Sequence, residues 1–169
     1  MWRPWWSWRL KQPSKKETYD HARGGKLKTH IIVHHSLTAD GQTVSWGAIE
    51  KYHRSLGWID IGYHAGVELI GDTYFALYGR PEYQFAAACK EEKMNQVGLH
   101  VCCVGNYDLV SPPDELLSTL AVRIIVPWLY RYDIPLERIM GHRDFAAYKS
   151  CPGTQFNLDK LRRLCRENL

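Results

Sequence analysis

Several residues of the types that bind transition metals stand beside turns or at the end of an apolar run. They are His34, His35, His64, His142 and Cys151. A catalytic zinc site holds its ion with three protein ligands and leaves a fourth position for water, and zinc accepts both imidazole and thiolate. Nine residues separate His142 from Cys151, enough for one loop to bring both side chains to one ion. A histidine in an apolar strand is, however, more often a buried residue with satisfied hydrogen bonds.

The first predicted elements place two of these histidines at the end of a strand. Residues 29–35 are apolar and rich in β-branched side chains, a pattern that predicts a buried strand. Apolar side chains then recur at helical spacing over 45–56, which predicts an amphipathic helix. Ser45 is the expected N-cap of this helix and Gly57 its expected C-cap.

A hairpin and a central strand are predicted in the middle of the chain. Residues 63–77 predict two strands joined at Gly71 and Asp72, which are typical residues of a hairpin turn. Residues 97–104 are apolar throughout, as is typical of a strand buried on both faces. The polar segment 106–113 contains two prolines and predicts a loop.

The last third of the chain predicts a helix, a short strand and a closing helix. Residues 114–132 carry a helical apolar stripe that Pro127 interrupts, so a kink is expected there. Residues 139–140 predict a brief strand, and 159–168 predict an amphipathic helix. This order of elements predicts a single-domain α/β fold: a mixed central β-sheet flanked by helices on both faces.

Residues 1–25 predict an N-terminal arm, which leaves 26–169 as the domain. The first nine residues hold four tryptophans among arginines and a proline, without the apolar stretch of a signal peptide. We therefore expect synthesis in the cytoplasm without a signal peptide. Tryptophan and arginine at this density suit lipid headgroups or glycan. The alternative is a tail that covers a groove of its own domain.

Composition limits the class of protein. A chain of 169 residues with 45% hydrophobic residues can bury a core without disulfides, and its longest apolar runs are only strand-sized, which excludes a spanning helix. The net charge of +4 suits a polyanionic surface such as a bacterial wall, and the interspersed charges do not favour nucleic acid as the main partner. The five irregularly spaced cysteines predict reduced thiols rather than a disulfide framework.

Four short segments, taken in order, resemble the zinc-dependent N-acetylmuramoyl-L-alanine amidases of the peptidoglycan-recognition-protein and phage-lysozyme type. They are Ile32-Val-His-His-Ser36, Trp58-Ile-Asp-Ile-Gly-Tyr-His64, Gly141-His-Arg-Asp144 and Lys149-Ser-Cys-Pro-Gly153. The resemblance covers residues 28–165, nearly the whole domain. Each segment alone is common, whereas four in the family's order are specific. The resemblance implies a peptidoglycan-recognition-protein-like amidase fold.

The resemblance also implies a set of metal ligands. His34, His142 and Cys151 match the family's three zinc ligands, so one Zn²⁺ per chain is expected. Neighbouring residues of a strand point to opposite faces, which supports choosing His34 over His35 as the first ligand. Cys151 also stands where the cytosolic recycling amidases have aspartate, and this favours an enzyme that acts on the wall itself.

The activity implied by the resemblance is hydrolysis of the amide between N-acetylmuramic acid and L-alanine in bacterial peptidoglycan, as in a phage or prophage endolysin. Zinc lowers the pKa of bound water to about 7 and so supplies hydroxide. Tyr63 matches a tyrosine that assists catalysis, and we expect its hydroxyl to bond the attacking water or the intermediate. Lys149 matches a lysine of the phage-type members, whose ammonium would stabilise the oxyanion.

The chain departs from the family ahead of the predicted central strand. The family commonly has Gly-Ala-His there, whereas residues 86–89 are Ala-Ala-Ala-Cys, so Ala88 stands where the family usually has histidine. This departure leaves the stem-peptide preference open.

Two other functions stay open at this point. One is a non-catalytic peptidoglycan-binding module, although such relatives typically lose the ligand cysteine that is present here as Cys151. The other is a regulator that binds another protein or nucleic acid on the same fold. We expect a monomer that acts on the cell wall after release, with a holin as a partner by family analogy.

Overall fold

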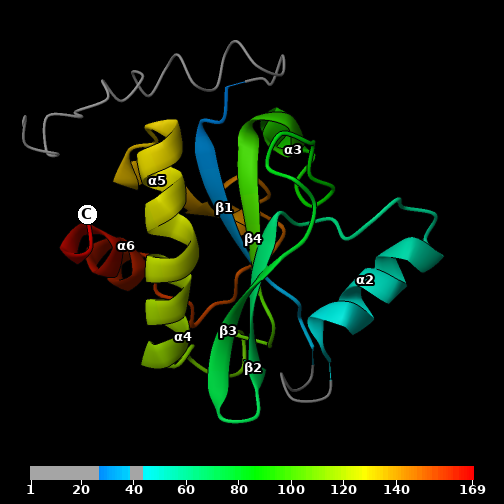
Figure 1. Cartoon of the computed structure of the whole chain (residues 1–169), viewed down its shortest axis with the longest axis horizontal. Helices are drawn as coiled ribbons and strands as arrows, with labels where there is room; N and C mark the ends of the chain where they lie inside the picture. The colour runs from blue at the N-terminus through cyan, green and yellow to red at the C-terminus, as the bar shows by residue number, and fades with distance from the viewer. Residues whose placement is uncertain (1–26, 39–43) are drawn as a thin grey trace, which may run out of the picture.

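The computed structural model describes residues 27–38 and 44–169, which form one mixed β-sheet with helices on both sides (Figure 1). The five strands lie in the order β3-β2-β4-β1-β5. They are β1 (His30–His35), β2 (Ala65–Ile70), β3 (Thr73–Tyr78), β4 (Gly98–Cys103) and β5 (Ile139–Gly141). β1 is parallel to β4 and β5, β2 is parallel to β4, and β3 is antiparallel to β2. The predicted α/β class with a mixed sheet is confirmed.

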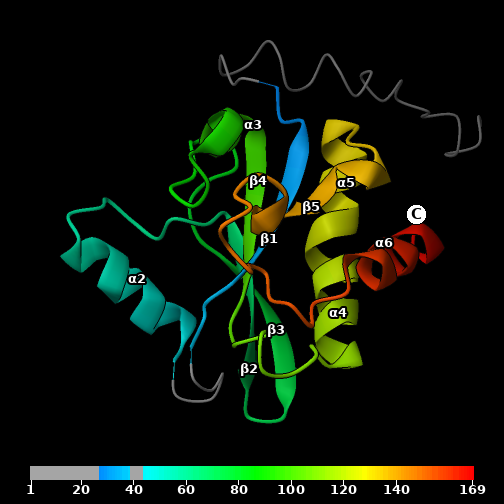
Figure 2. The ribbon, with the colours of Figure 1, turned by 180° about the vertical axis from the view of Figure 1, so that it is seen from behind.

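The helices divide between the two sides of the sheet, as Figures 1 and 2 show from opposite directions. On one side lie α4 (Asp114–Leu120), α5 (Val126–Tyr132) and α6 (Leu158–Glu167). On the other side lie α2 (Trp46–Ser55) and the single turn α3 (Met94–Val97). Short helical segments complete the chain: the 3₁₀ turns Glu91–Lys93, Leu136–Arg138 and His142–Asp144, and the π turn Ala121–Ile125.

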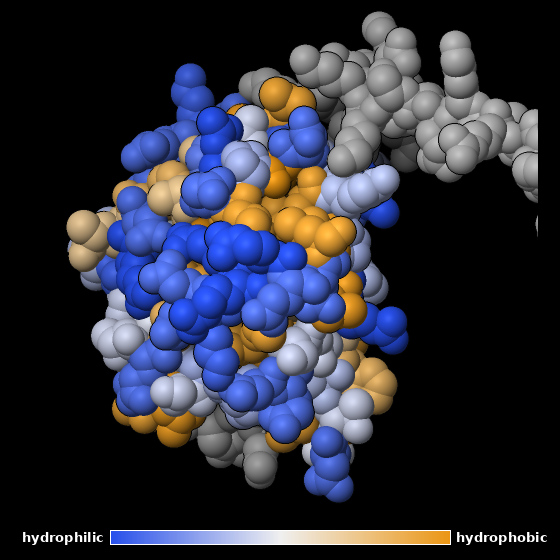
Figure 3. Space-filling view, turned by 90° about the vertical axis from the view of Figure 1, so that its left-hand side faces the viewer, coloured by the Kyte–Doolittle hydropathy of each residue, from blue (hydrophilic) through white to orange (hydrophobic). Residues whose placement is uncertain are grey.

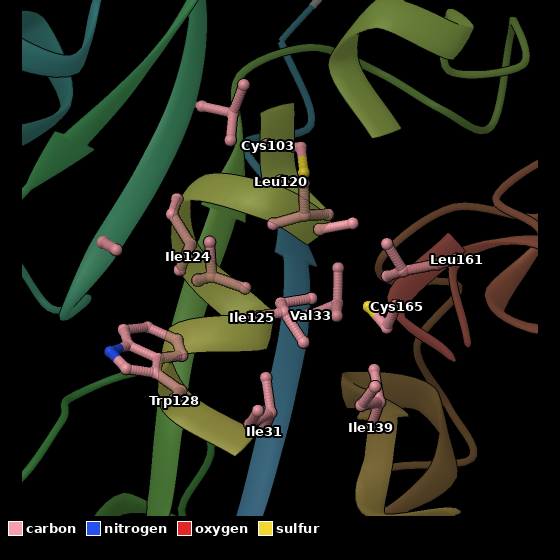
Figure 4. Close-up of a cluster of buried hydrophobic side chains, with 14 of the residues drawn as sticks. Ile31, Val33, Cys103, Leu120, Ile124, Ile125, Trp128, Ile139, Leu161 and Cys165 are labelled. Atoms are coloured by element: carbon pink, nitrogen blue, oxygen red, sulfur yellow. The ribbon is translucent and has the colours of Figure 1, made fainter. Parts of the chain in front are cut away.

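The main core lies between the sheet and the helices α4 to α6. Figure 4 shows Ile31 and Val33 of β1 pointing toward Ile124 and Ile125, with Leu161 of α6 closing the cluster. Residues along a strand alternate between faces, so Ile32 and His34 lie on the opposite face of β1. On this second face of the sheet the described residues form two small apolar clusters, around Trp46 and Met94, and the face carries the polar residues described below.

The helical segment 114–132 changes its winding before its proline. The α-helix ends at Leu120, a π turn spans Ala121–Ile125, and Pro127 lies in the first turn of α5. Proline has no N–H to donate to the carbonyl four residues earlier, that of Arg123. The Tyr78 hydroxyl of β3 donates to this carbonyl across 3.4 Å. The α-helical winding is therefore interrupted by a π turn just before Pro127, and the kink expected at Pro127 stays a prediction.

Helix α2 begins as the sequence predicts but packs over only half its length. The Ser45 hydroxyl accepts a hydrogen bond from the N–H of Ala48, and Gly57 follows the helix with a φ of +87°. Trp46 and Ile49 are buried, whereas Tyr52 and Leu56 of the same predicted stripe are 62% and 52% exposed. The C-terminal part of the predicted stripe is therefore exposed, because the C-terminal half of α2 extends beyond the sheet (Figure 1).

The side of the molecule formed by α4 to α6 is largely hydrophilic, with smaller apolar areas between the polar ones (Figure 3). Across the described residues, helices are too short and too polar to cross a bilayer. All five cysteines lie in the described part of the chain and are free thiols. The predicted arm 1–25 lies outside the described residues.

Candidate active site

The two histidines at the end of β1 face opposite sides of the sheet. His34 is 1% exposed and lies on the face away from α4 to α6, where its ring is 4.9 Å from the ring of His142. His35 faces the other way, and its Nδ1 accepts a hydrogen bond from the N–H of Tyr107 across 3.2 Å. Only His34 therefore points toward the other metal-binding side chains.

Three side chains far apart in the sequence meet beyond the end of β1. His142 comes from the 3₁₀ turn after β5, and Cys151 comes from the loop that follows it. One donor atom from each of His34, His142 and Cys151 lies within 4.8 Å of the other two. His34 Nδ1 is 3.6 Å from Cys151 Sγ. Zinc bonds of about 2.0 Å to nitrogen and 2.3 Å to sulfur at a tetrahedral angle would separate these two atoms by about 3.5 Å, close to the observed distance, so the pair fits a zinc ion.

A second group of donors overlaps the first at His142. Cys89, Glu91 and His142 also bring their donor atoms within 4.8 Å of one another. The buried Nε2 of His142 has no hydrogen-bond partner among the described residues and lies 3.7 Å from Glu91 Oε2. Hydrogen bonding, chiefly from the Tyr148 hydroxyl, lowers the pKa of Glu91 to about 2. Glu91 therefore places a carboxylate charge beside His142, two residues after the stretch 86–89 where the sequence departs from its family.

Burial sets the charge of the donor groups. It lowers the pKa of His34 well below the usual value, with the neighbouring rings of His100 and His142 adding to the effect. The His34 ring is therefore neutral and keeps a lone pair. Burial also raises the pKa of the Cys151 thiol to about 11, although the backbone N–H of His35 and the ammonium of Lys149 act in the opposite direction. A metal cation bound here would displace the thiol proton.

The arginine and aspartate of Gly141-His-Arg-Asp144 hold this corner in shape. The Arg143 guanidinium donates to the carbonyls of Gly153 and Phe156, and the backbone N–H of Arg143 donates to the carbonyl of Cys151 across 2.7 Å. The Asp144 carboxylate accepts from the N–H of Gly141 across 2.8 Å. Arg143 thus ties the turn that carries His142 to the loop that carries Cys151.

The loop after Cys151 also needs a glycine at one position. Gly153 has a φ of +123°, and a Cβ there would lie 2.4 Å from the backbone of Tyr107. The neighbouring Asp108 carboxylate accepts hydrogen bonds from the Ser150 hydroxyl and the Thr154 N–H, both across 2.7 Å. The ligand loop is therefore held from both sides of Cys151.

Tyr63 lies directly beside the donor group, two residues before β2. Its ring centroid is 5.3 Å from that of His34 and 6.3 Å from that of Trp46. Burial raises the pKa of Tyr63 well above its usual value, and the nearby thiols of Cys102 and Cys151 add to this effect. The hydroxyl also forms a hydrogen bond with Cys102. Tyr63 therefore carries its proton at neutral pH and is a donor rather than a base.

Lys149 lies at the surface of the same corner. Its ammonium is 5.6 Å from the ring centroid of Tyr148, and its backbone N–H donates to the carbonyl of Ala146 across 2.8 Å. Its charge lowers the pKa of His34, of His142 and of the Cys151 thiol. An ammonium in this position would stabilise negative charge that develops beside these side chains.

The other candidate histidine, His64, has its polar atoms satisfied within the core. Its Nδ1 accepts from the backbone N–H of His100 across 2.9 Å, and its Nε2 donates to the carbonyl of Gln84 across 3.0 Å. The structure therefore brings together His34, His142 and Cys151 and leaves His35 and His64 outside the group.

Three residues at this site were not singled out by the sequence analysis: Glu91, His100 and Arg143. Glu91 lies in a segment without apolar periodicity. His100 lies within an apolar strand and gave no signal beyond its residue type. Arg143 belongs to the segment Gly141-His-Arg-Asp144, but its hydrogen-bond partners are main-chain carbonyls ten and thirteen residues away. A pattern of side-chain types cannot predict such partners.

Comparison with known proteins identifies a family for this chain. Residues 24–154 match the family described as N-acetylmuramoyl-L-alanine amidase. The endolysin of Enterobacteria phage T3 is 30% identical over 128 residues, which cover 72% of this chain and 78% of that protein. The endolysin of Escherichia phage T7 has the same identity and coverage.

Solved structures share the fold. The amidase LysCS from Clostridium intestinale URNW has a TM-score of 0.68 at 20% identity, with 81% of this chain and 82% of that chain covered. Drosophila PGRP-LB has a TM-score of 0.62 at 24% identity, with 76% of each chain covered. With the family match extending over most of the chain, this protein belongs to the N-acetylmuramoyl-L-alanine amidase family.

Proposed function

We propose that this chain is a zinc-dependent endolysin that hydrolyses the amide between N-acetylmuramic acid and L-alanine in bacterial peptidoglycan. The observation that carries the proposal is the group His34, His142 and Cys151, whose donor atoms lie within 4.8 Å of one another. Two imidazoles and one thiolate with room for water are a donor set of catalytic zinc. The match to the amidase family and to phage endolysins supports the same substrate and source.

The side chains around the donor group suit hydrolysis of an amide. Zinc, when bound, supplies a Lewis acid and lowers the pKa of water to about 7. Tyr63 keeps its proton, so its hydroxyl can exchange the bond with Cys102 for one to the substrate oxygen as negative charge develops. The Lys149 ammonium adds positive charge on the exposed side of the site.

The proposal gives the N-terminal arm a targeting role. Residues 1–25, with their tryptophans and arginines, would direct the domain 26–169 to the wall or to lipid headgroups. One zinc ion per chain and a monomeric enzyme are part of the proposal. Release from the cytoplasm would depend on a holin, by analogy with the family.

Zinc content and wall clearing, measured together, test the proposal. Purified parent protein should hold one zinc per chain and clear a suspension of purified sacculi, and Cys151→Ser and His34→Ala should lose both properties. Cys165→Ala is the matched control, because Cys165 is a buried thiol in α6 on the opposite side of the sheet and should keep zinc and clearing. Full clearing by His34→Ala with one tightly bound zinc would contradict the ligand assignment.

A further inference from the structure

His100 is a buried polar residue of β4 that the proposed reaction does not use. Its side chain is fully buried in the central strand of the sheet. In the register of the parallel pair, His34 of β1 lies opposite Cys102, two residues beyond His100. Residues two apart on a strand share a face, so His100 lies on the same face as His34. The two ring planes differ by 25°, and their centroids are 5.2 Å apart.

The hydrogen bonds of His100 determine which nitrogen carries its proton. Its Nε2 is 2.9 Å from the carbonyl oxygen of Met94, and a carbonyl can only accept. Nε2 is therefore the protonated nitrogen, and Nδ1 of the neutral ring has a lone pair. None of the hydrogen bonds or ion pairs of the described residues joins His100 to a carboxylate, so the fully buried ring has no counter-charge for a second proton.

This arrangement in turn determines the tautomer of His34. His100 Nδ1 lies 2.9 Å from His34 Nε2 and accepts a hydrogen bond from the N–H at that position. The lone pair of His34 is therefore on Nδ1, the atom that lies 3.6 Å from Cys151 Sγ in the donor group. A metal-binding histidine commonly donates its other N–H to an acceptor that fixes the ring, and here the acceptor is a second histidine.

The surroundings of His100 are built around these bonds. Met94 begins the single turn α3, where its carbonyl also accepts from the N–H of Gly98. A Cβ on Gly98 would lie 2.8 Å from both His100 Nε2 and the Met94 oxygen, so glycine leaves the space for their hydrogen bond. On the other side, His64 Nδ1 accepts from the backbone N–H of His100. The ring is therefore held at its polar atoms and through its backbone.

We propose that His100 is a positioning residue for the metal site: it holds His34 in the tautomer and ring orientation that present Nδ1 to the ion. The inference rests on the proposed function, because it concerns the same zinc ion. Among the described residues, the side chain of His100 has no hydrogen bond or ring contact with His142 or Cys151. Its loss should weaken zinc binding, since the N–H of His34 would then be buried without an acceptor.

Zinc affinity, measured on the full chain by competition with a chelator, tests this inference. His100→Leu should bind zinc about 10- to 100-fold more weakly than the parent. His100→Asn should restore most of the affinity, because its side-chain oxygen can stand near the position of Nδ1 and accept from His34. His64→Asn is the matched control: it replaces a buried imidazole of the same cluster that does not contact His34, its side-chain oxygen can still accept from the backbone N–H of His100, and it should keep the parent's zinc affinity.

The pattern of results separates the inference from the proposed function. A parent protein that binds no zinc contradicts the proposed function. A parent that binds zinc, with His100→Leu binding equally well or falling no further than His64→Asn, overturns only the role of His100. Should His100→Leu fail to fold, long-range ¹H–¹⁵N spectra of the zinc-loaded parent decide. Protonated Nε2 and metal-bound Nδ1 on His34 support the inference, and the opposite tautomer overturns it.

Discussion

At the scale of single residues, the site depends on side chains that hold or withhold a proton. His34 is neutral because it is buried beside other imidazoles, and Tyr63 keeps its proton because burial and nearby thiols oppose its ionisation. The first can therefore donate a lone pair to a cation, and the second can donate a hydrogen bond to a developing oxyanion. These two properties follow from the surroundings of each residue rather than from its type.

Substitution of the two catalytic candidates should separate turnover from metal binding. Tyr63→Phe removes one hydroxyl and Lys149→Ala removes one ammonium, and the structure includes neither among the metal donors. Loss of one stabilising donor typically lowers turnover about 10²- to 10³-fold. We expect both variants to fold, to hold one zinc and to lose most of their turnover on wall fragments. Near-normal turnover in both, with zinc present, would contradict the proposed roles.

The buried His64 makes the stability of the protein depend on pH. Burial lowers its pKa from 6.5 to about 3, so between these values the unfolded chain binds a proton that the folded chain does not. The free energy of unfolding therefore falls as the pH drops below 6.5. His64→Asn removes this titration while an oxygen can still accept from the N–H of His100.

Chemical denaturation of parent and His64→Asn at pH 7 and pH 5 measures this effect. The stability advantage of the parent over the variant should shrink by about 2 kcal/mol between these two values, since one group then contributes about 1.4 kcal/mol per pH unit below 6.5. Zinc bound to both proteins contributes equally and cancels in the difference. A difference that stays constant with pH would show that His64 titrates normally in the folded protein.

At the scale of elements, the donor residues are supplied by a strand end, a turn and a loop that must be held together. The end of β1 is joined to the end of β4 through Ser36, whose hydroxyl accepts from the N–H of Gly105 across 2.8 Å. Arg143 joins the turn of His142 to the loop of Cys151. The donors are thus held by polar contacts between connecting segments, on the ends of a rigid parallel sheet.

Removal of the Arg143 side chain should loosen this corner. Arg143→Ala leaves the carbonyls of Gly153 and Phe156 without their charged donor, and such hydrogen bonds contribute about 1.5–3 kcal/mol. We expect a loss of about that size in the free energy of unfolding, together with weaker zinc binding. Arg163→Ala, on the exposed face of α6, is the control and should change stability by less than about 0.5 kcal/mol. Equal effects of the two substitutions would argue against the bracing role.

Sequence patterns predicted the elements better than the contacts between them. The β-branched run before His34 and the apolar run around Val101 correctly predicted β1 and the central strand β4, because a buried parallel strand is apolar on both faces. The apolar stripe of α2 did not predict where the helix extends beyond the sheet. Periodicity shows which face of a helix is apolar, but not whether another element packs against that face. The partners of His100 and Arg143 include main-chain carbonyls, which no side-chain pattern records.

At the scale of the whole molecule, one side of the sheet supports the fold and the other carries the chemistry. The cluster between the sheet and α4 to α6 holds most of the buried apolar residues (Figure 4), whereas His34, His100, His142 and Tyr63 gather beyond the opposite face. This division allows substitutions at the site to change activity while the main core stays intact. The arm 1–25 is the remaining part of the chain to be assigned a role.

Deletion of the arm should separate wall targeting from bond cleavage. A variant that begins at Lys26 keeps every described donor residue, so it should hold one zinc and hydrolyse soluble muropeptides at close to the parent's rate. Clearing of intact wall should be slower, because the tryptophans and arginines of the arm suit a glycan or headgroup surface. A lower melting temperature with equal losses on both substrates would mean that the arm packs into the domain instead.

The identity of the bond that is cut tests the central claim most directly. Mass spectrometry of purified peptidoglycan after digestion should find stem peptides with a free L-alanine amino terminus and glycan chains that carry the free lactyl carboxyl group. Removal of zinc with a chelator should abolish both products, and added zinc should restore them. New reducing sugar ends, cuts within the stem peptide, or the same products after complete removal of zinc would contradict a zinc-dependent N-acetylmuramoyl-L-alanine amidase.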